Sequence, residues 1–354
     1  MRFTVDSDQL KDAFSKCASV APSRSPKEIL MNVLFRMEGD KLLLVGTDTN
    51  SSVIAELEAQ VDKPGSMLIS SERLGRLVRE LHGELSFEFE GSQILLRAPG
   101  AEYKLPTASA NEFPAPKRLA VEEMKVDSET FMRAIKKTIF ACEQDSARYA
   151  LGGVRLDSGL VIGCDGRRLA TCQLGLPEDV QALIPEKAAQ TIASMLRDET
   201  AYICHDLNSV QVRCGKFTLI TRQLEGRYPD WRQVLPSKDD KYRATLTAGS
   251  LYSAIRQAAI ATDTETRGVD LSFSEGAIDL KAQAAEKGQA SVSVPAEYNG
   301  SPTTVKLDHK YCEEFLRTCE SSDVVSIYVG EPSQSVLFED ANGAAYVVMP
   351  MAKG

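Results

Sequence analysis

Histidine, tryptophan and long apolar runs are all scarce in this chain of 354 residues, which holds three histidines and one tryptophan. No apolar run approaches the roughly 18 residues that span a membrane, and the first residues lack the apolar core of a signal peptide. His82, His205 and His309 share no metal-ligand spacing, so a histidine metal site is not expected. These absences favour a cytoplasmic protein without metal or cofactor.

Paired cysteines and catalytic signatures are also missing. The eight cysteines are scattered, and none forms a Cys-x-x-Cys pair. We therefore expect reduced, mostly buried thiols rather than a disulfide framework or a zinc site. The chain has no Gly-x-Ser-x-Gly, no His-Glu-x-x-His and no phosphate loop ending in Gly-Lys-Ser/Thr. The pair Asp165-Gly166 is more typical of a hairpin turn than of a catalytic aspartate.

An excess of positive charge is missing too, since 41 Lys and Arg face 50 Asp and Glu, for a net charge of −9. Taken globally, this charge argues against a protein that grips nucleic acid through many phosphate contacts. Basic residues nevertheless gather on single faces of two predicted helices, as Arg73, Arg76 and Arg79 and as Arg133, Lys136 and Lys137. Acidic residues concentrate in strands and loops. The alternative for any one helix is an ordinary solvated face.

A threefold internal repeat organises the chain. A short strand at 3–5 leads into a helical run at 7–19, and the same layout recurs at 124–126 with 128–140 and at 244–246 with 249–260. The copies lie about 120 residues apart, and their apolar positions stay in register. Each copy also contains a second strand and helix, which begin near residues 67, 182 and 305. Trailing strands alternate apolar and polar residues.

This layout predicts an α+β protein of three tandem domains, each built from two half-units of one strand, one helix and further strands. Connectors rich in proline and charge, at 112–123 and 235–243, set the boundaries. We therefore expect domains at 1–122, 123–242 and 243–354.

One connector, 225–236, is unusual because it combines breakers with apolar mass. Pro229 and Pro236 exclude a regular helix or an internal strand, yet Tyr228 and the single tryptophan, Trp231, lie between or beside them. One interpretation is a linker whose aromatic side chains tuck between two domains. The other is a segment that walls a groove for a partner.

Four stretches together resemble the β sliding clamps, the processivity subunits of bacterial DNA polymerase III: residues 1–5, 164–170, 226–231 and 346–351. With the threefold layout, the resemblance covers essentially the whole chain. It implies three clamp domains with inner helices and outer antiparallel sheets, and a head-to-tail homodimer that closes a ring around duplex DNA. The implied function is to tether the replicative polymerase for processive synthesis, without catalysis, exonuclease activity or cofactor. A modestly basic lining suits sliding rather than gripping, and DNA contact would be independent of sequence.

The resemblance also implies sites and partners. The partners would be duplex DNA, the polymerase III catalytic subunit, the clamp loader, and other polymerases and repair proteins that insert a short apolar peptide. The peptide pocket would comprise Leu151, Cys164, Gly166, Arg167, Arg168, Leu169, Tyr228, Pro229, Gln233, Val234, Val347, Val348, Met349, Pro350 and Met351. Arg24, Arg148 and Tyr149 would join the basic helix faces in contacting DNA. The dimer interface would use Tyr103, Leu105, Ile260 and Ala261.

Some positions depart from the family pattern. Cys164 stands where threonine is usual, Arg167 where histidine is common, and the chain ends Met351-Ala352-Lys353-Gly354 instead of in methionine-arginine-leucine. The altered tail leaves open a specialised clamp paralogue that serves a single partner. A further alternative is an enzyme that acts on nucleotides through Asp165, Arg167 and Arg168.

Overall fold

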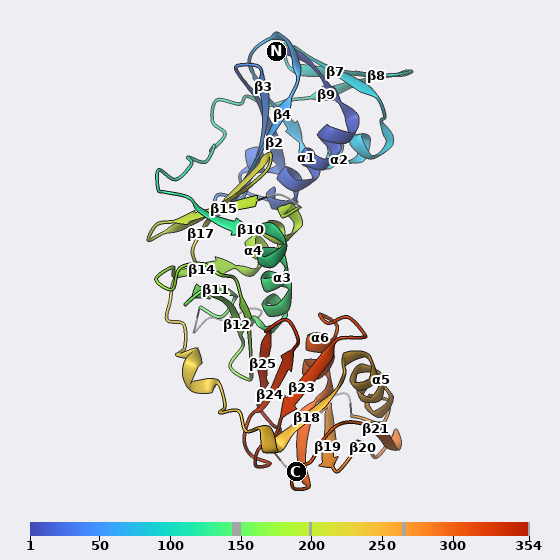
Figure 1. The fold of residues 1–354 in the computed structure, drawn as a ribbon. Helices are drawn as coiled ribbons and strands as arrows, with labels where there is room; N and C mark the ends of the chain where they lie inside the picture. Colours follow the sequence, from blue (N-terminus) through green and yellow to red (C-terminus); the bar gives the residue numbers. More distant parts are fainter. Residues whose placement is uncertain (144–149, 198–199, 264–266, 353–354) are drawn as a thin grey trace. The chain divides into compact units, whose positions relative to one another are not determined.

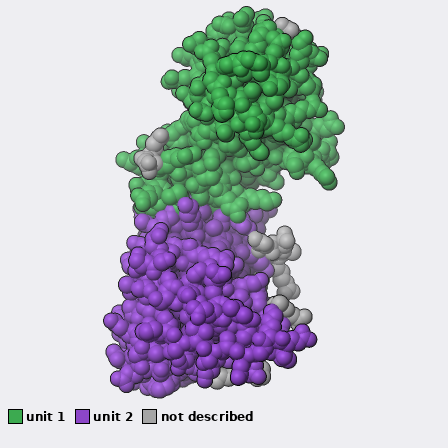
Figure 2. Space-filling view, turned by 90° about the vertical axis from the view of Figure 1, so that its right-hand side faces the viewer, with its two compact units in different colours: residues 1–132, 187–223 green, residues 133–186, 224–354 purple. Residues whose placement is uncertain are grey.

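The computed structural model describes residues 1–143, 150–197, 200–263 and 267–352 (Figure 1). The chain divides into two compact units, residues 1–132 with 187–223 and residues 133–186 with 224–354 (Figure 2). Helices and antiparallel strands alternate along both units, which confirms the α+β class. Among the described residues, no helix has the length and apolar character needed to cross a membrane.

Unit 1 contains two antiparallel sheets. The five-stranded sheet has the order β5-β1-β7-β8-β9, with β1 (Arg2–Asp6), β5 (Gln60–Lys63), β7 (Glu84–Glu90), β8 (Gln93–Ala98) and β9 (Ala101–Pro106). The eight-stranded sheet has the order β10-β15-β16-β17-β4-β3-β2-β6, with β2 (Asn32–Glu38), β3 (Lys41–Thr47), β4 (Ser51–Glu58), β6 (Ser66–Ser70), β10 (Met124–Asp127), β15 (Thr200–His205), β16 (Ser209–Cys214) and β17 (Phe217–Arg222).

Helices α1 (Ser7–Val20) and α2 (Ser71–Glu80) lie side by side in unit 1, and α1 packs on β3 and β4 (Figure 1). Asp6 caps α1 by accepting hydrogen bonds from the backbone N–H groups of Asp8 and Gln9, which satisfies donors that a helix start leaves free. The apolar stripe of α1, including Phe14, is buried. Nearby, the rings of Phe3 and Phe87 stack with centroids 5.0 Å apart. The helix predicted at 7–19 is therefore confirmed, and its apolar stripe forms core.

Unit 2 has the same construction. Its eight-stranded sheet has the order β14-β11-β12-β13-β25-β24-β23-β18, with β11 (Gly153–Asp157), β12 (Leu160–Cys164), β13 (Arg168–Gln173), β14 (Ala182–Pro185), β18 (Arg243–Thr247), β23 (Val324–Tyr328), β24 (Val336–Asp340) and β25 (Ala345–Val348). Its four-stranded sheet has the order β21-β20-β19-β22, with β19 (Gly268–Ser274), β20 (Ala277–Ala284), β21 (Gly288–Pro295) and β22 (Thr303–Asp308).

Helices α5 (Ala248–Ala259) and α6 (His309–Leu316) pack against each other in unit 2 (Figure 1). Leu251 and Ile255 of α5 join Phe315 of α6, Phe338 and Tyr346 in one buried cluster. The rings of Phe315 and Tyr346 stack with centroids 5.0 Å apart. With α3 (Ser128–Thr138) and α4 (Glu186–Met195), the described residues contain the six α-helices that the half-unit pattern predicts.

Both eight-stranded sheets join strands from two neighbouring repeats. In unit 1, β17 pairs with β4 and sets Leu219 opposite Val53. In unit 2, β13 pairs with β25 and sets Leu169 opposite Val347. Each junction covers a strand edge that would otherwise be exposed. The two compact units therefore do not follow the three repeats, since the middle repeat contributes strands to each of them.

Candidate functional site

The turn between β12 and β13 supplies one corner of the candidate site. Asp165 accepts hydrogen bonds from the backbone N–H groups of Arg167 and Arg168 at 2.9 and 3.0 Å. Gly166 has a φ of +85°, a conformation that favours glycine. The prediction of a hairpin turn at Asp165-Gly166 is confirmed. These hydrogen bonds fix the turn. Gly166 and Arg167 at its tip are exposed.

A buried apolar cluster lies behind this turn, and we call it the pocket cluster. It gathers residues from the repeat containing β11 to β14, from the connector and from strands β24 and β25, namely Ala150, Leu151, Ile162, Cys164, Leu169, Leu183, Tyr228, Trp231, Leu337 and Val347, with Val234 and Tyr328 among those packed against it. Five predicted pocket residues are members of this set: Leu151, Cys164, Leu169, Tyr228 and Val347. Burial raises the pKa of the Cys164 thiol and of the Tyr228 hydroxyl, so both groups stay neutral at physiological pH.

The connector is held in place by a carboxylate. Asp157, at the end of β11, is 4% exposed and accepts hydrogen bonds from Arg155 Nε at 3.0 Å and from Trp231 Nε1 at 3.3 Å. Arg232 adds an ion pair at 3.2 Å. Burial opposes ionisation, but the hydrogen bonds from Arg155, Trp231 and Ser158 outweigh it and hold the pKa of Asp157 below its usual range. The connector forms one turn of 3-10 helix, η3 (Trp231–Val234), so it is ordered without a regular helix or strand.

The last strand places the tail beside the turn. β25 lies between β13 and β24, and beyond it the N–H of Met349 donates to the carbonyl oxygen of Arg167 across 2.9 Å. Met349 is 46% exposed, while Pro350 and Met351 are half-buried. Exposed, flexible methionine beside a buried apolar floor suits a surface that accepts several ligand shapes. The predicted pocket members Gln233 and Pro229 lie on the connector, exposed and half-buried respectively.

Two of the predicted pocket residues lie elsewhere. Successive side chains of a strand point to opposite faces of the sheet, so Val348 joins the core cluster with Phe315 and not the pocket cluster. Arg168 pairs with Val348 in register and is 9% exposed. Both side chains face away from the pocket cluster, and their place in the peptide pocket stays a prediction.

Arg168 belongs to a network that the sequence did not reveal. Its guanidinium bonds Asp165, Glu314 and the carbonyl oxygen of Phe140, and it lies 4.4 Å from the ring centroid of Tyr311. Burial disfavours its charge, but Tyr346 and Glu314 outweigh this effect and raise the pKa of Arg168. Arg168 thus links β13 to α6. Tyr311 and Glu314 were missed because only the pairing of β13 with β25 brings α6 close.

Most of the basic residues predicted to contact DNA are exposed, and the contact itself stays a prediction. Arg73, Arg76 and Arg79 on α2 are all exposed, as are Arg24 and Lys136, and Arg133 is half-buried. Arg76 has an exposed ion pair with Glu72 at 2.6 Å, which stabilises weakly. Arg148 and Tyr149 lie outside the described residues.

Lys137 is the exception on α3. It is 5% exposed, its Nζ lies 2.6 Å from Asp340 of β24, and it donates to the Cys319 sulfur at 3.3 Å. Burial lowers its pKa, but Asp340 outweighs the effect and the pKa of Lys137 is raised. The prediction that Lys137 contacts DNA is wrong, because its ammonium group is buried in unit 2 and paired there with Asp340.

The predicted interface residues occupy strand and helix ends. Tyr103 and Leu105 belong to β9, which is an edge strand of its sheet. Ile260, at the end of α5, is 75% exposed, whereas Leu105 and Ala261 are 9% and 4% exposed. Covering Ile260 would remove apolar surface from water, although a single exposed apolar residue is common on protein surfaces.

Comparison with known families decides the identity. Residues 1–117 match the N-terminal domain of the DNA polymerase III beta subunit, residues 125–230 its central domain, and residues 232–352 its C-terminal domain. The chain belongs to the DNA polymerase III beta subunit family. The resemblance predicted from four sequence stretches is thereby confirmed, as are the three tandem clamp domains.

Individual members of the family agree. The beta sliding clamp of Escherichia coli strain K12 is 28% identical over 368 residues, which cover 99% of this chain and 100% of that protein. The beta sliding clamp of Pseudomonas putida is 27% identical with the same coverage. The crystal structure of the sliding clamp from Pseudomonas aeruginosa superposes with a TM-score of 0.91 at 26% identity, covering 100% of both chains. Beta subunits of this family are processivity factors and not catalysts, so the alternative of a nucleotide-acting enzyme is set aside.

Proposed function

We propose that two copies of this chain close head to tail into a ring around duplex DNA and tether the replicative polymerase during synthesis. The observation that carries the proposal is the tandem match of three beta-subunit domains over residues 1–352. Domain boundaries at 1–122, 123–242 and 243–354 are part of this proposal. The ring would act in the cytoplasm, on the nucleoid.

DNA contact would come from the exposed basic side chains of α2 and α3, together with Arg24. Their number is small, and the chain as a whole is acidic. Each phosphate contact releases counterions and strengthens binding, so few contacts leave the ring free to slide. Retention would then depend on closure around the duplex and not on affinity. The exposed Ile260 and the edge strand β9 support a junction between copies, since pairing across a junction covers a strand edge.

Polymerase, loader and repair proteins would bind the pocket cluster through a short apolar peptide. Leu151, Tyr228 and Val347 form its floor, and the turn at Arg167 and the exposed Met349 form its margin. Buried apolar anchors would carry most of the affinity. Gly166, Pro229, Gln233, Val234, Pro350 and Met351 would contribute surface around these anchors. A paralogue that serves one partner differs only in the range of peptides accepted, and a panel of partner peptides distinguishes the two roles.

The deciding experiment combines solution mass with retention on plasmid DNA. The ring predicts the mass of a dimer, and after loading it predicts retention on nicked circular plasmid with rapid loss from the same plasmid once linearised. A protein that stays monomeric at all concentrations, or that leaves circular and linear DNA equally fast, contradicts the proposal.

A further inference from the structure

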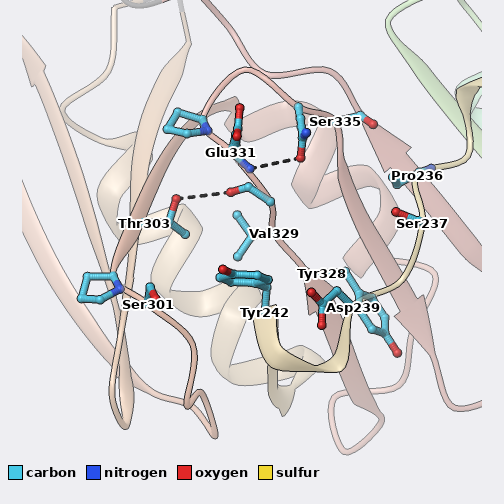
Figure 3. A pocket seen from close by; sticks show the side chains of 14 residues that line it. Pro236, Ser237, Asp239, Tyr242, Ser301, Thr303, Tyr328, Val329, Glu331 and Ser335 are labelled. Carbon is cyan, nitrogen blue, oxygen red and sulfur yellow. Dashed lines mark hydrogen bonds between the residues drawn. The ribbon is translucent and has the colours of Figure 1, made fainter.

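Unit 2 contains a cavity of about 670 Å³ that lies outside the pocket cluster (Figure 3). Three segments line it: residues 236–242, which begin at the last residue of the connector, residues 301–303, and residues 328–335. Its volume is in the range of sites that enclose a small ligand or a side chain. None of the residues that line it was assigned to the peptide pocket.

Hydrogen bonds fix the walls of this cavity. The N–H of Val329 donates to the carbonyl oxygen of Tyr242 across 3.1 Å. This bond holds the segment that follows the connector against the end of β23. The hydroxyl of Thr303 donates to the carbonyl oxygen of Gly330 at 3.4 Å, and the N–H of Glu331 donates to the Gln334 side chain at 3.1 Å (Figure 3). Fixed walls reduce the ordering cost of binding.

The lining is acidic and partly aromatic, and one oxygen of the Asp239 carboxylate already accepts the backbone N–H of Lys241 at 3.0 Å. Asp239 and Glu331 are its charged residues, and no lysine, arginine or histidine is among the described residues that line it. Tyr242 and Tyr328 add aromatic rings. A guanidinium or ammonium gains from carboxylates and from aromatic faces together. In Figure 3, Tyr242 and Val329 lie in the middle of the site, and Asp239 lies beside Tyr328.

Of three basic residues close to the cavity, two pair with carboxylates outside its lining and one lies near a ring of the lining. Lys238 lies 2.6 Å from Glu339, and Arg243 lies 3.3 Å from Asp240. Lys241 Nζ lies 5.3 Å from the ring centroid of Tyr242. This chain therefore already places one of its own cations near a cavity ring, and Lys241 would compete weakly with an incoming one.

The cavity adjoins the pocket cluster through shared residues. Tyr328 packs against the pocket cluster and also lines the cavity, and Leu235, which packs against the same cluster, directly precedes Pro236. A single extended segment could therefore cover both sites.

We propose that this cavity binds a lysine or arginine side chain from the part of the partner protein that flanks its pocket-binding peptide. The inference rests on the proposed peptide pocket, and it adds a charge-reading subsite to it. Partners with a basic flank would bind more tightly than partners with an acidic flank.

The test uses synthetic peptides that share the clamp-binding sequence of the polymerase III catalytic subunit. One peptide carries Gly-Ser-Arg-Arg at each end, one carries Gly-Ser-Glu-Glu, and one has no extension. Fluorescence anisotropy would measure their dissociation constants with the full-length protein, with Asp239→Asn/Glu331→Gln, and with the control Glu275→Gln/Glu286→Gln. The control removes two exposed acidic residues of unit 2 that lie outside the cavity lining. A Lys241→Ala variant tests the competing lysine.

For the unaltered protein and the control, we expect the arginine peptide to bind about fivefold more tightly than the glutamate peptide, as for one partly exposed ion pair. The cavity variant should reduce the ratio below about twofold without changing the affinity for the unextended peptide. Lys241→Ala should increase the ratio. An equal loss in the control and cavity variants overturns the inference, because it assigns the effect to overall charge. If the unextended peptide fails to bind, the peptide pocket and this inference fall together.

Discussion

The indole Nε1 of Trp231 donates a hydrogen bond to the Asp157 carboxylate across 3.3 Å, and so attaches the connector to the end of β11. The same carboxylate also holds Arg155 and Arg232. Tyr228, which contributes to the floor of the pocket cluster, stands three residues before Trp231. Arg155, which Asp157 holds, lies 5.5 Å from the ring centroid of Tyr228, so an aspartate outside the predicted pocket supports an aromatic side chain within it.

Removing this carboxylate should loosen the connector. Asp157→Ala removes the acceptor of the indole and one acceptor of each of two guanidinium groups, and we expect a loss of about 2 kcal/mol in the free energy of unfolding. Trp231 is the single tryptophan of the chain, so its fluorescence reports this site alone and its emission should shift to the red. Glu225→Ala is the control, because it removes an exposed carboxylate of the same connector that is not a partner of Trp231. Equal emission spectra for all three proteins would contradict the anchoring role.

Acid should have the same effect on the native protein. The pKa of Asp157 is lowered in the folded state, so its stabilisation is complete above the ordinary aspartate pKa of about 3.9 and is lost as the pH falls through the lower folded value. The emission of Trp231 should therefore stay constant down to about pH 4 and shift to the red below it. Asp157→Asn should lack this acid-dependent step. A step at higher pH, or one retained in the variant, would assign the titration to another group.

The buried pair of Lys137 and Asp340 should behave as a unit. Lys137→Met leaves the Asp340 carboxylate buried without its counter-ion, which should cost about 3 kcal/mol. Adding Asp340→Asn removes the stranded charge and preserves a side-chain oxygen that can accept from Asn342 and Ala344, so the double variant should recover most of the loss. Chemical denaturation of the four proteins gives the coupling free energy. Additive losses would show that the two charges do not interact.

Truncation after Val348 should separate peptide binding from assembly. It deletes the exposed Met349 and the hydrogen bond from its N–H to Arg167, but leaves β25 intact in its sheet. We expect the affinity for a polymerase peptide to fall by more than about tenfold, with the dimer mass unchanged. Truncation after Met351 serves as the control and should bind as the full chain does. Unchanged affinity in the shorter protein would remove Met349, Pro350 and Met351 from the pocket.

Charge reversal on α2 should weaken retention on DNA. The triple change of Arg73, Arg76 and Arg79 to glutamate replaces exposed positive charge by negative charge, and phosphate repulsion should then shorten the lifetime on nicked circular plasmid. Changing Lys125, Arg222 and Lys281 to glutamate gives the matched control, since these are exposed basic residues on strands. If both triple variants are lost from the plasmid at the same rate, α2 has no special part in contacting DNA.

Local pattern was enough to predict the helices and their buried faces. Leu10, Phe14 and Cys17 recur at helical spacing, and the structure buries all three. The sheets that join the repeats were not predicted, because strand periodicity identifies a face but not a partner strand. The burial of Lys137 was missed for this reason. In the helix pattern it looks equivalent to Lys136, and its partner Asp340 comes from a strand some 200 residues later. Similarly, the buried Arg168 pairs with Glu314, and no local sequence pattern connects these two residues.

The position of β25 has a consequence for biosynthesis. This strand is the last in the chain, yet it lies between β13 and β24 in the middle of an eight-stranded sheet. While the ribosome still holds residues 345–348, the two halves of that sheet cannot join, and each exposes an unpaired strand. Completion of unit 2 must therefore wait until residues 345–348 have emerged from the ribosome. Until then, a chaperone that shields strand edges would protect the two halves of the sheet.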